Sequence, residues 1–463
     1  MKIADRNNEF FNIIGRMVII VPRILTLIAL TFSFICPTTL KAGGAITTTP
    51  EPAPVVTLKD AVRSALAKTE AVPLGEARIN QADARIDQAR SRFFPALSFG
   101  ANFQQQDASG VLSQQSSNLF GGRQSYTRFS LSQSIYEGGR DQSALSASKF
   151  DKEVQRQNLS VAGYATFTNV ARGFYAILSG EREAENLNKT IAFADDRVKE
   201  LRNRAKIGRS RNIELMAAQA QLSVLEAQLA AVEGQLVVAR DQFILTTGLP
   251  QEVRLMEKRE KPDPPKTLDE YLSHLDKRPD VAAVKAQIES TKHSIDTAKA
   301  GHLPSIGVAG NYYITREGTQ QGNNWDVGGT LTLPLFAGGL VKAQVRETSE
   351  KLIESEFLLK QTRRQAEISI RTAYNNLLSA FNQLKALDSA LESTEDNYRE
   401  QEKNYRFGQA TNLDVIQALN TFQDTKRTLD KTRFLALSAW AELKAATAQV
   451  SLAQVMSEGG GGL

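Results

Sequence analysis

Few side chains in this chain of 463 residues have the chemistry of a catalytic or metal-binding group. It contains one cysteine, Cys36, and three histidines, His274, His293 and His302. The histidines are too far apart for the two-histidine spacing of an HExxH zinc helix, and a single cysteine excludes a site built from several thiolates. The sequence shows no grouping of histidine, serine and acidic residues that is typical of a catalytic site. We therefore predict no enzyme activity, no metal and no cofactor.

Two carboxylates stand at equivalent places and could act electrostatically. Glu214 follows Gly208 by six residues, and Asp414 follows Gly408 by the same number. If several copies of the chain surround a pore, such carboxylates form rings that concentrate cations and resist anions. The alternative is that both are ordinary acidic residues at helix starts, where the helix dipole favours them.

These turns belong to an internal repeat. The segments around Gly138 and Gly208 recur around Gly338 and Gly408, both at an offset of 200 residues. Two copies are too few for a solenoid, so we expect one duplicated unit inside a single architecture. The predicted segments are a signal peptide (1–45), a linker (46–56), the first copy (57–250), a charged proline-rich connector (251–266), the second copy (267–450) and a flexible tail (451–463).

The first 45 residues have the pattern of a secretory signal peptide. Basic residues precede an apolar run from Ile24 to Cys36, and small residues up to Ala45 offer a cleavage site. The run is too short for a membrane span of about 20 residues. Met17 is an alternative start. Lipidation of Cys36 is the alternative fate of this segment, although bulky residues stand where a lipidation signal needs small ones.

The excess of basic residues comes mainly from this leader. Of 56 basic and 51 acidic residues, five and two lie in it. The predicted mature chain is therefore close to neutral, and a nucleic-acid ligand loses its support.

Each copy ends in a long stretch with the 3-4 apolar spacing of a coiled coil. In the second copy a heptad series consists of Leu384, Leu391, Tyr398 and Tyr405. The pattern predicts helical hairpins over 140–249 and 340–450, reversed at the glycine turns. The first helix would span about 100 Å at 1.5 Å per residue, which is far longer than a globular domain.

Between a short first helix and each hairpin, apolar and small polar residues alternate as in strands. The four predicted strands cover about 95–106, 125–136, 304–316 and 325–336. An ordinary half-buried sheet shows the same alternation, but the neighbouring helices are already committed to their own heptads. A transmembrane barrel is favoured, and four strands cannot close one, since the smallest have about eight. We therefore expect an obligate oligomer that shares the barrel wall.

The paired glycines before each hairpin are a second candidate site. Gly138, Gly139, Gly338 and Gly339 stand in no phosphate-binding frame. We expect them to let each strand pass into the following helix.

The duplicated unit of short helix, β-hairpin and long helical hairpin resembles the TolC family of outer-membrane efflux and secretion channels, over about residues 57–450. The resemblance rests on the segments Arg278-Pro279-Asp280-Val281, Pro334-Leu335-Phe336-Ala337-Gly338-Gly339 and Tyr405-Arg406-Phe407-Gly408. It implies a mainly α fold with a transmembrane β part, in which a homotrimer forms a 12-strand outer-membrane barrel continued by a periplasmic α-helical barrel. It also implies a passive exit duct in the outer membrane, working with a periplasmic adaptor and an inner-membrane RND or ABC transporter in drug efflux or type I secretion. A periplasmic coiled-coil scaffold without channel activity is the alternative.

The resemblance further implies an aperture at the hairpin turns. Asp414 matches the first aperture carboxylate of the family, whereas Gln417 stands where some members have a second one. We expect Arg209 and Arg211 to pair with Asp414 or Glu214 when the aperture is closed. The turns themselves would dock the adaptor, through Gly208, Gly408, Asn212 and Asn412.

Overall fold

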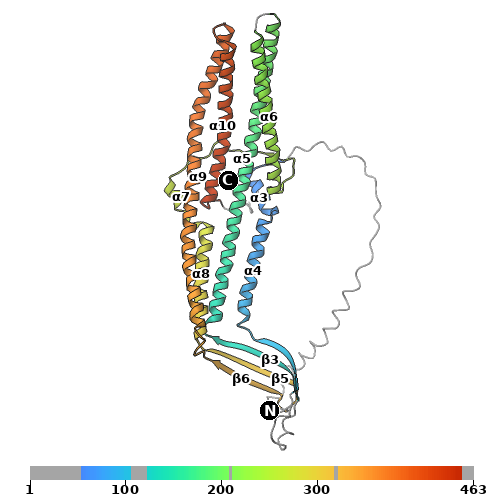
Figure 1. Ribbon diagram of the computed structural model, residues 1–463, viewed down its shortest axis with the longest axis vertical. Coiled ribbons are helices and arrows are strands. Elements are labelled where there is room, and N and C mark those ends of the chain that lie inside the picture. The colour runs from blue at the N-terminus through green and yellow to red at the C-terminus, as the bar shows by residue number, and fades with distance from the viewer. Residues whose placement is uncertain (1–53, 106–122, 208–210, 318–321, 451–463) are drawn as a thin grey trace, which may run out of the picture. The chain divides into compact units, whose positions relative to one another are not determined.

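The computed structural model describes residues 54–105, 123–207, 211–317 and 322–450, all within one compact unit, Ala53–Leu463 (Figure 1). The signal peptide predicted over 1–45, most of the linker predicted over 46–56, the tail at 451–463, and Gly208 and Arg209 at the first hairpin turn lie outside the described residues. The unit consists of a four-stranded sheet, two long helical hairpins, and a small layer of helices and strands beside the hairpins.

The sheet is antiparallel and contains β2 (Ala96–Gln105), β3 (Arg123–Glu137), β5 (Ser305–Glu317) and β6 (Trp325–Thr332), in the order β2-β3-β5-β6. One face is apolar and exposed. Along it an aromatic row crosses all four strands, because Phe99 pairs with Phe129, Phe129 with Tyr312, and Tyr312 with Trp325. Such a face exposed on an isolated sheet requires a cover of lipid or protein.

The register of β3 and β5 shifts twice, which changes the faces that strict alternation predicts. Thr127 pairs with Thr315 but Arg128 pairs with Tyr313, so that Ile314 is skipped. Strict alternation would place Thr315 on the polar face, but its pairing with Thr127 places it on the apolar face. A β-bulge of this kind inserts one residue and exchanges the two faces beyond it.

The last predicted strand is shorter than the sequence pattern indicates. It was predicted over about 325–336, but β6 ends at Thr332. Pro334 has no amide hydrogen for the ladder. The following segment leads through Gly338 and Gly339 directly into the next helix.

Two long helical hairpins run from the sheet to their turns. The first contains α5 (Arg140–Lys206) and α6 (Asn212–Thr247), and the second α9 (Leu340–Arg406) and α10 (Asn412–Ala446). Across the two hairpins, α5 contacts α10. Near the sheet α4 (Ala71–Ser91) packs on α5, and α8 (Pro279–Lys299) packs between α5 and α9. Among the described helices, α6 alone is long and apolar enough to cross a membrane by composition.

A small equatorial layer joins the two copies at mid-length of α5 and α9. It contains β1 (Val55–Val56), which pairs in parallel with β4 (Arg254–Leu255), together with α3 (Leu58–Lys68) and α7 (Leu268–Leu272). The segment predicted as a linker therefore ends in a strand, and the predicted connector contains its partner. The two-residue strands carry no alternation that a sequence could show.

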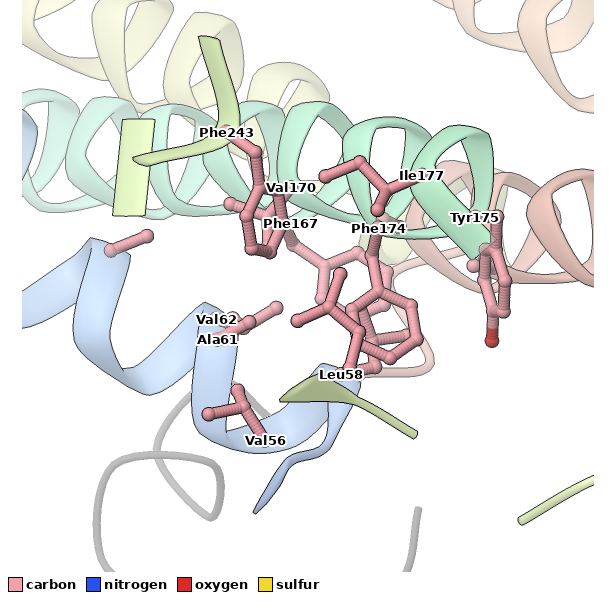
Figure 2. Close-up of a cluster of buried hydrophobic side chains, with 14 of the residues drawn as sticks. Val56, Leu58, Ala61, Val62, Phe167, Val170, Phe174, Tyr175, Ile177 and Phe243 are labelled. Atoms are coloured by element: carbon pink, nitrogen blue, oxygen red, sulfur yellow. The ribbon is translucent and has the colours of Figure 1, made fainter. Parts of the chain in front are cut away.

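The core beneath this layer is apolar and draws on distant segments (Figure 2). Phe167 and Phe174 of α5 and Phe243 of α6 pack with Leu437 of α10. Further members are Val56, Leu58, Val62, Val170, Ile177, Leu255, Ala441 and Val450. We call this set the equatorial core. It fixes α5 against α10 at the level of the equatorial layer.

Candidate functional site

The second hairpin turn is closed by a glycine and a capping box. Gly408 has φ +75°, the left-handed conformation that favours glycine. Thr411 caps α10: its hydroxyl accepts from the Asp414 amide at 3.3 Å, and the Asp414 carboxylate accepts from the Thr411 amide at 2.8 Å. The hydroxyl of Thr411 also donates to that carboxylate at 2.6 Å. The carboxylate of Asp414 thus provides a hydrogen-bond acceptor for the amide of the N-cap residue of α10.

These hydrogen bonds hold Asp414 ionised. Its carboxyl is fully exposed, and the bonds from the Thr411 hydroxyl and amide lower its pKa below the ordinary value. Gln417, one turn further along α10, is also exposed. A charge is therefore present at the start of α10, as an aperture carboxylate would require.

The start of α6 differs from the start of α10. Arg211 occupies the N-cap of α6 and makes no side-chain cap. Its guanidinium pairs with Glu214 of the same turn, at 3.1 Å between Nη2 and Oε1. Arg211 thus pairs within the first turn of its own helix, and a pairing across the closed aperture stays a prediction. The carboxylate of Asp414 is bonded to Thr411, three residues away in the same hairpin.

A cluster that the sequence pattern did not reveal joins the two hairpins close to their tips. Arg197 Nε of α5 donates to Asn412 Oδ1 of α10 at 2.8 Å, and Arg204 Nη1 donates to the Tyr405 hydroxyl of α9 at 2.8 Å. The guanidinium of Arg197 also lies 4.5 Å from the centroid of the Tyr405 ring. Glu200 pairs with both arginines from within α5. We call these five residues the tip cluster.

The tip cluster changes the interpretation of two residues. Tyr405 was predicted as a coiled-coil core position, but its ring receives two cations from the other hairpin. Asn412 was predicted as a turn residue for adaptor docking, yet it is buried beneath Arg197, while Asn212 of the first copy is exposed. The spacing of Arg197, Glu200 and Arg204 on one helical face was the available signal.

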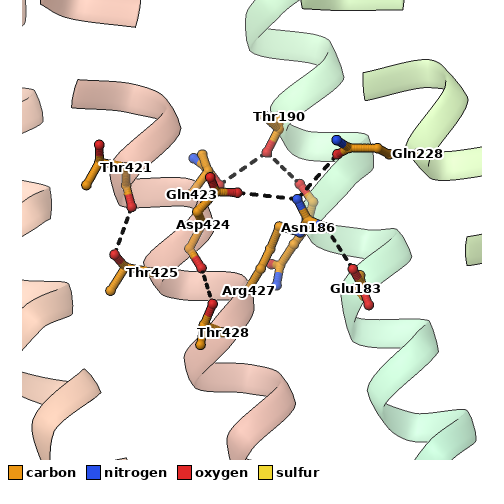
Figure 3. Close-up of polar contacts among 10 residues, drawn as sticks. All are labelled: Glu183, Asn186, Thr190, Gln228, Thr421, Gln423, Asp424, Thr425, Arg427 and Thr428. Carbon is orange, nitrogen blue, oxygen red and sulfur yellow. Dashed lines mark hydrogen bonds and ion pairs between the residues drawn. The ribbon is translucent and has the colours of Figure 1, made fainter. Parts of the chain in front are cut away.

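Between the tip cluster and the equatorial core, α5 and α10 meet through polar side chains (Figure 3). Thr190 donates to Gln423 at 3.2 Å, and Asn186 donates to Asp430 at 2.8 Å. Arg427 pairs with Glu183 at 2.8 Å. Asn186, Thr190 and Gln423 are buried. We call these six residues the polar seam.

Outside the equatorial core, the described clusters of buried apolar residues in α5, α6, α9 and α10 stay inside one hairpin each. Val198, Leu201 and Ala218 form a cluster within α5 and α6. Ala380, Leu384 and Ala436 form another within α9 and α10. Each hairpin is thus closed by its own apolar contacts, and the described links between them away from the equator are polar. Such links exchange for bonds to water when the hairpins separate.

At the other end of the hairpins, the paired glycines mark the passage from strand to helix. Gly139 and Gly339 are the N-cap residues of α5 and α9, with φ +80° and +84°. Gly138 and Gly338 also have positive φ. A Cβ atom on Gly138 would lie 2.6 Å from the Cβ of Leu303. Glycine is required there by the backbone and by space. No group of acidic, histidine and cysteine side chains in the described segments has the arrangement of a metal site.

Comparison with protein families places both copies of the unit in one family. The model of the outer membrane efflux protein family matches residues 61–249 and 272–449. Outer membrane efflux protein BepC of Brucella suis is 22% identical over 296 residues, which span 63% of this chain and 64% of BepC. TolC of Escherichia coli is 23% identical over 392 residues, or 78% of this chain and 76% of TolC. The match thus spans less than two thirds of BepC and about three quarters of TolC.

Solved structures show the same fold. VceC of Vibrio cholerae superposes with a TM-score of 0.72 at 17% identity, covering 84% of this chain and 95% of VceC. The CmeC outer membrane channel of Campylobacter jejuni gives 0.72 at 17% identity, covering 84% and 85%. At this level of identity the likeness establishes the fold and leaves the site residues to be argued from this chain.

Proposed function

The chain belongs to the outer membrane efflux protein family, and we propose that it is a passive exit duct through the outer membrane. The observation that carries the proposal is the pairing of a sheet that is apolar and exposed on one face with helices of 67 residues, in a chain whose two copies both match the family. The sheet would cross the membrane, and the helices would extend the passage into the periplasm.

The proposed duct is a homotrimer. The sheet ends in two unpaired edges, β2 and β6, and three copies joined at these edges supply twelve strands. Open edges are not tolerated within a bilayer, because their backbone groups have no partners there. Val224, Val237 and Leu245 of α6 are exposed in one chain. In the trimer they would lie against a neighbouring copy.

The proposed partners are a periplasmic adaptor and an inner-membrane RND or ABC transporter, which would select the cargo and supply the energy. The matched proteins include both an efflux protein, BepC, and an alkaline protease secretion protein, AprF of Pseudomonas aeruginosa, which is 22% identical over 175 residues, or 37% of this chain and 36% of AprF. The proposed cargo therefore includes small molecules and secreted proteins.

We further propose that the hairpin tips form the periplasmic aperture. Asp414, Glu214 and Gln417 would line it, and the tip cluster would hold the closed state. Support comes from the polar character of the tip cluster and the polar seam, because polar links cost little to exchange for water. A docking adaptor can then separate the hairpins without exposing either apolar hairpin interior.

The duct is tested by purification of the protein, by conductance measurements and by deletion of its gene. The protein should require detergent and produce discrete conductance steps in a planar lipid bilayer. Deletion of the gene should raise drug sensitivity or abolish secretion of a protein, and the parallel measurement of both identifies the cargo. A protein that is water-soluble and inactive in bilayers would instead be the coiled-coil scaffold.

The aperture is tested separately by a cross-link. Arg204→Cys with Tyr405→Cys removes the tip cluster contact and places thiols on facing hairpins, and the mature chain predicted here has no other cysteine. A cleavable bis-maleimide linker should lower the conductance of this variant, and its cleavage should restore it. The same variant without linker is the matched control. Unaltered conductance through both steps would contradict the aperture.

A further inference from the structure

The polar face of the sheet carries one concentrated group of large charged side chains. Most other described residues on that face are small, such as Ser98, Gly100 and Ser132. Towards the end of the sheet away from the helices, Tyr126 pairs with Arg316 and Arg128 pairs with Tyr313 across β3 and β5.

These four residues form interleaved cation–ring contacts. The guanidinium carbon of Arg128 lies 4.9 Å from the Tyr126 centroid, and that of Arg316 lies 4.0 Å from the Tyr313 centroid. The two rings meet edge to face at 6.1 Å. Ring contacts of this kind hold a guanidinium in place without neutralising its charge.

One carboxylate lies beside them, on the neighbouring strand. Asp326 of β6 accepts from Asn311 at 2.7 Å and lies 4.0 Å from Arg316. Asn311 in turn accepts from Ser130 at 2.7 Å. The described charges therefore comprise two cations and one anion in each copy. We call Tyr126, Arg128, Tyr313, Arg316 and Asp326 the arginine–tyrosine cluster.

The register shift at Ile314 is what brings both arginines together. In a regular strand Tyr313 and Arg316, three residues apart, would point to opposite faces. Arg316 would then share the face of Tyr312, where an arginine in a lipid-facing barrel wall costs about 2–4 kcal/mol at mid-membrane. Because Ile314 is skipped in the pairing, Arg316 lies instead on the polar face next to Tyr313.

We propose that the arginine–tyrosine cluster is an anion-attracting site that biases passage through the outward half of the duct. The inference rests on the proposed function, because the polar face lines a lumen only when the sheet is part of a closed barrel. Three copies would place six guanidinium groups and three carboxylates at one level. Fixed charges at a narrow passage raise the local concentration of the opposite charge. The ligands are small anions and the carboxylate or phosphate groups of cargo.

The test is a reversal-potential measurement on the full-length protein in planar bilayers, with a KCl gradient at low ionic strength. Removing the charges with Arg128→Gln and Arg316→Gln should lower the chloride-to-potassium permeability ratio about two- to fivefold. Asp326→Asn should raise that ratio. Arg128→Lys with Arg316→Lys keeps the charge and should leave the ratio close to the wild-type value.

A matched control is available in the equatorial connector. Arg259 also contacts an aromatic ring, that of Trp440 at 4.5 Å, and a carboxylate, that of Asp263 at 3.0 Å. Since it lies away from the sheet, Arg259→Gln should not alter the permeability ratio. Conductance steps with an unaltered ratio in the glutamine and asparagine variants would overturn this inference alone. Absence of any conductance in the wild-type protein would overturn the duct and, with it, this site.

Discussion

The contact between α5 and α10 has an apolar core at the equator, with the ion pair of Arg172 and Glu442 beside it, and polar pairs from there to the tips. At the equator Phe167 and Phe174 pack with Leu437, in a core whose members are almost fully buried. Towards the tips the same two helices meet through pairs such as Thr190 with Gln423 and Arg197 with Asn412. One helix pair therefore has a fixed part and a part that water can enter.

The difference follows from what separation costs in each part. Pulling apart the equatorial core exposes apolar surface at about 25 cal/mol for each Å². Pulling apart a polar pair exchanges it for bonds to water, with a net cost of about 0.5–1.5 kcal/mol, or about 1.5–3 kcal/mol for a charged group. A movement of the hairpins should therefore pivot at the equator and open at the tips.

The largest effect is expected from the fixed part. Leu437→Ala removes most of a side chain that is 1% exposed and leaves a cavity in the equatorial core. The unfolding free energy should fall by about 2–5 kcal/mol. Gln423→Ala, in the polar seam of the same helix, should cost only about 1–2 kcal/mol. Denaturant unfolding of the purified full-length protein measures both. Equal losses would remove the distinction between the two parts.

A smaller effect on stability, but a larger one on gating, is expected at the tips. Arg197→Gln with Arg204→Gln removes the charge-assisted bonds of the tip cluster. The closed state should lose on the order of 1–2 kcal/mol, which is about a tenfold change in the open-to-closed ratio. Single-channel recording measures this ratio.

Arg399 provides the control for that experiment. Its guanidinium pairs with Glu395 on the same helix, and its side chain is 69% exposed. Because this pair joins no second hairpin, Arg399→Gln should leave gating unaltered. A change as large as that of the double variant would show that general charge loss, and not the inter-hairpin link, is responsible.

The third prediction concerns a variant in which part of the polar seam becomes apolar, as the equatorial core is. Thr190→Val with Gln423→Leu replaces both partners of one buried pair, so that no polar group is left unsatisfied. The unfolding free energy should change by less than about 1 kcal/mol. In the tip double-glutamine background, however, the open fraction should fall, because separation now exposes apolar surface. An unchanged open fraction would mean that hairpin separation does not pass through the seam.

The smallest effect concerns the pH dependence of the α10 start. The pKa of Asp414 is lowered in the folded chain, so its stabilising contribution is present above the unfolded value of about 3.9 and is lost as pH falls through the lower folded pKa. The protection of the amides in the first turn of α10, measured as exchange relative to the intrinsic rate at each pH, should therefore fall in this acid range. Asp414→Asn should remove the dependence, whereas Glu395→Gln should not. A persistent dependence in the asparagine variant would assign it to another group.

Much of the fold could be predicted because its signals are periodic and repeated. The heptad series and the glycine turns indicated two hairpins, and the alternation indicated four strands, all of which the structure contains. The family was likewise predicted from the repeat and its motifs, and the family match confirms it. The aperture residues Asp414, Glu214, Gln417 and Arg211 stay a prediction.

What could not be predicted depends on contacts between distant segments. Arg197 meets Asn412 across 215 residues of sequence. The spacing of Arg197 with its neighbours marks a charged helix face, but no local pattern indicates that Asn412 is the partner. The strands β1 and β4 pair over two residues each, and their Val56 and Leu255 belong to the equatorial core, a contact that no local pattern indicates. Tyr405 keeps heptad spacing while its ring faces cations, because spacing describes the face of a helix and not its neighbour.

The sequence by itself determined the duplication, the length of the helices and the segments that alternate, since each is a local pattern of side-chain size and polarity. Only the tertiary structure decided which parts of the hairpins adhere through apolar contacts and which through polar ones. It also decided the face of Arg316, because one skipped residue in the strand pairing reverses the alternation. Strand register is set by the partner strand, and a single sequence contains no record of that partner.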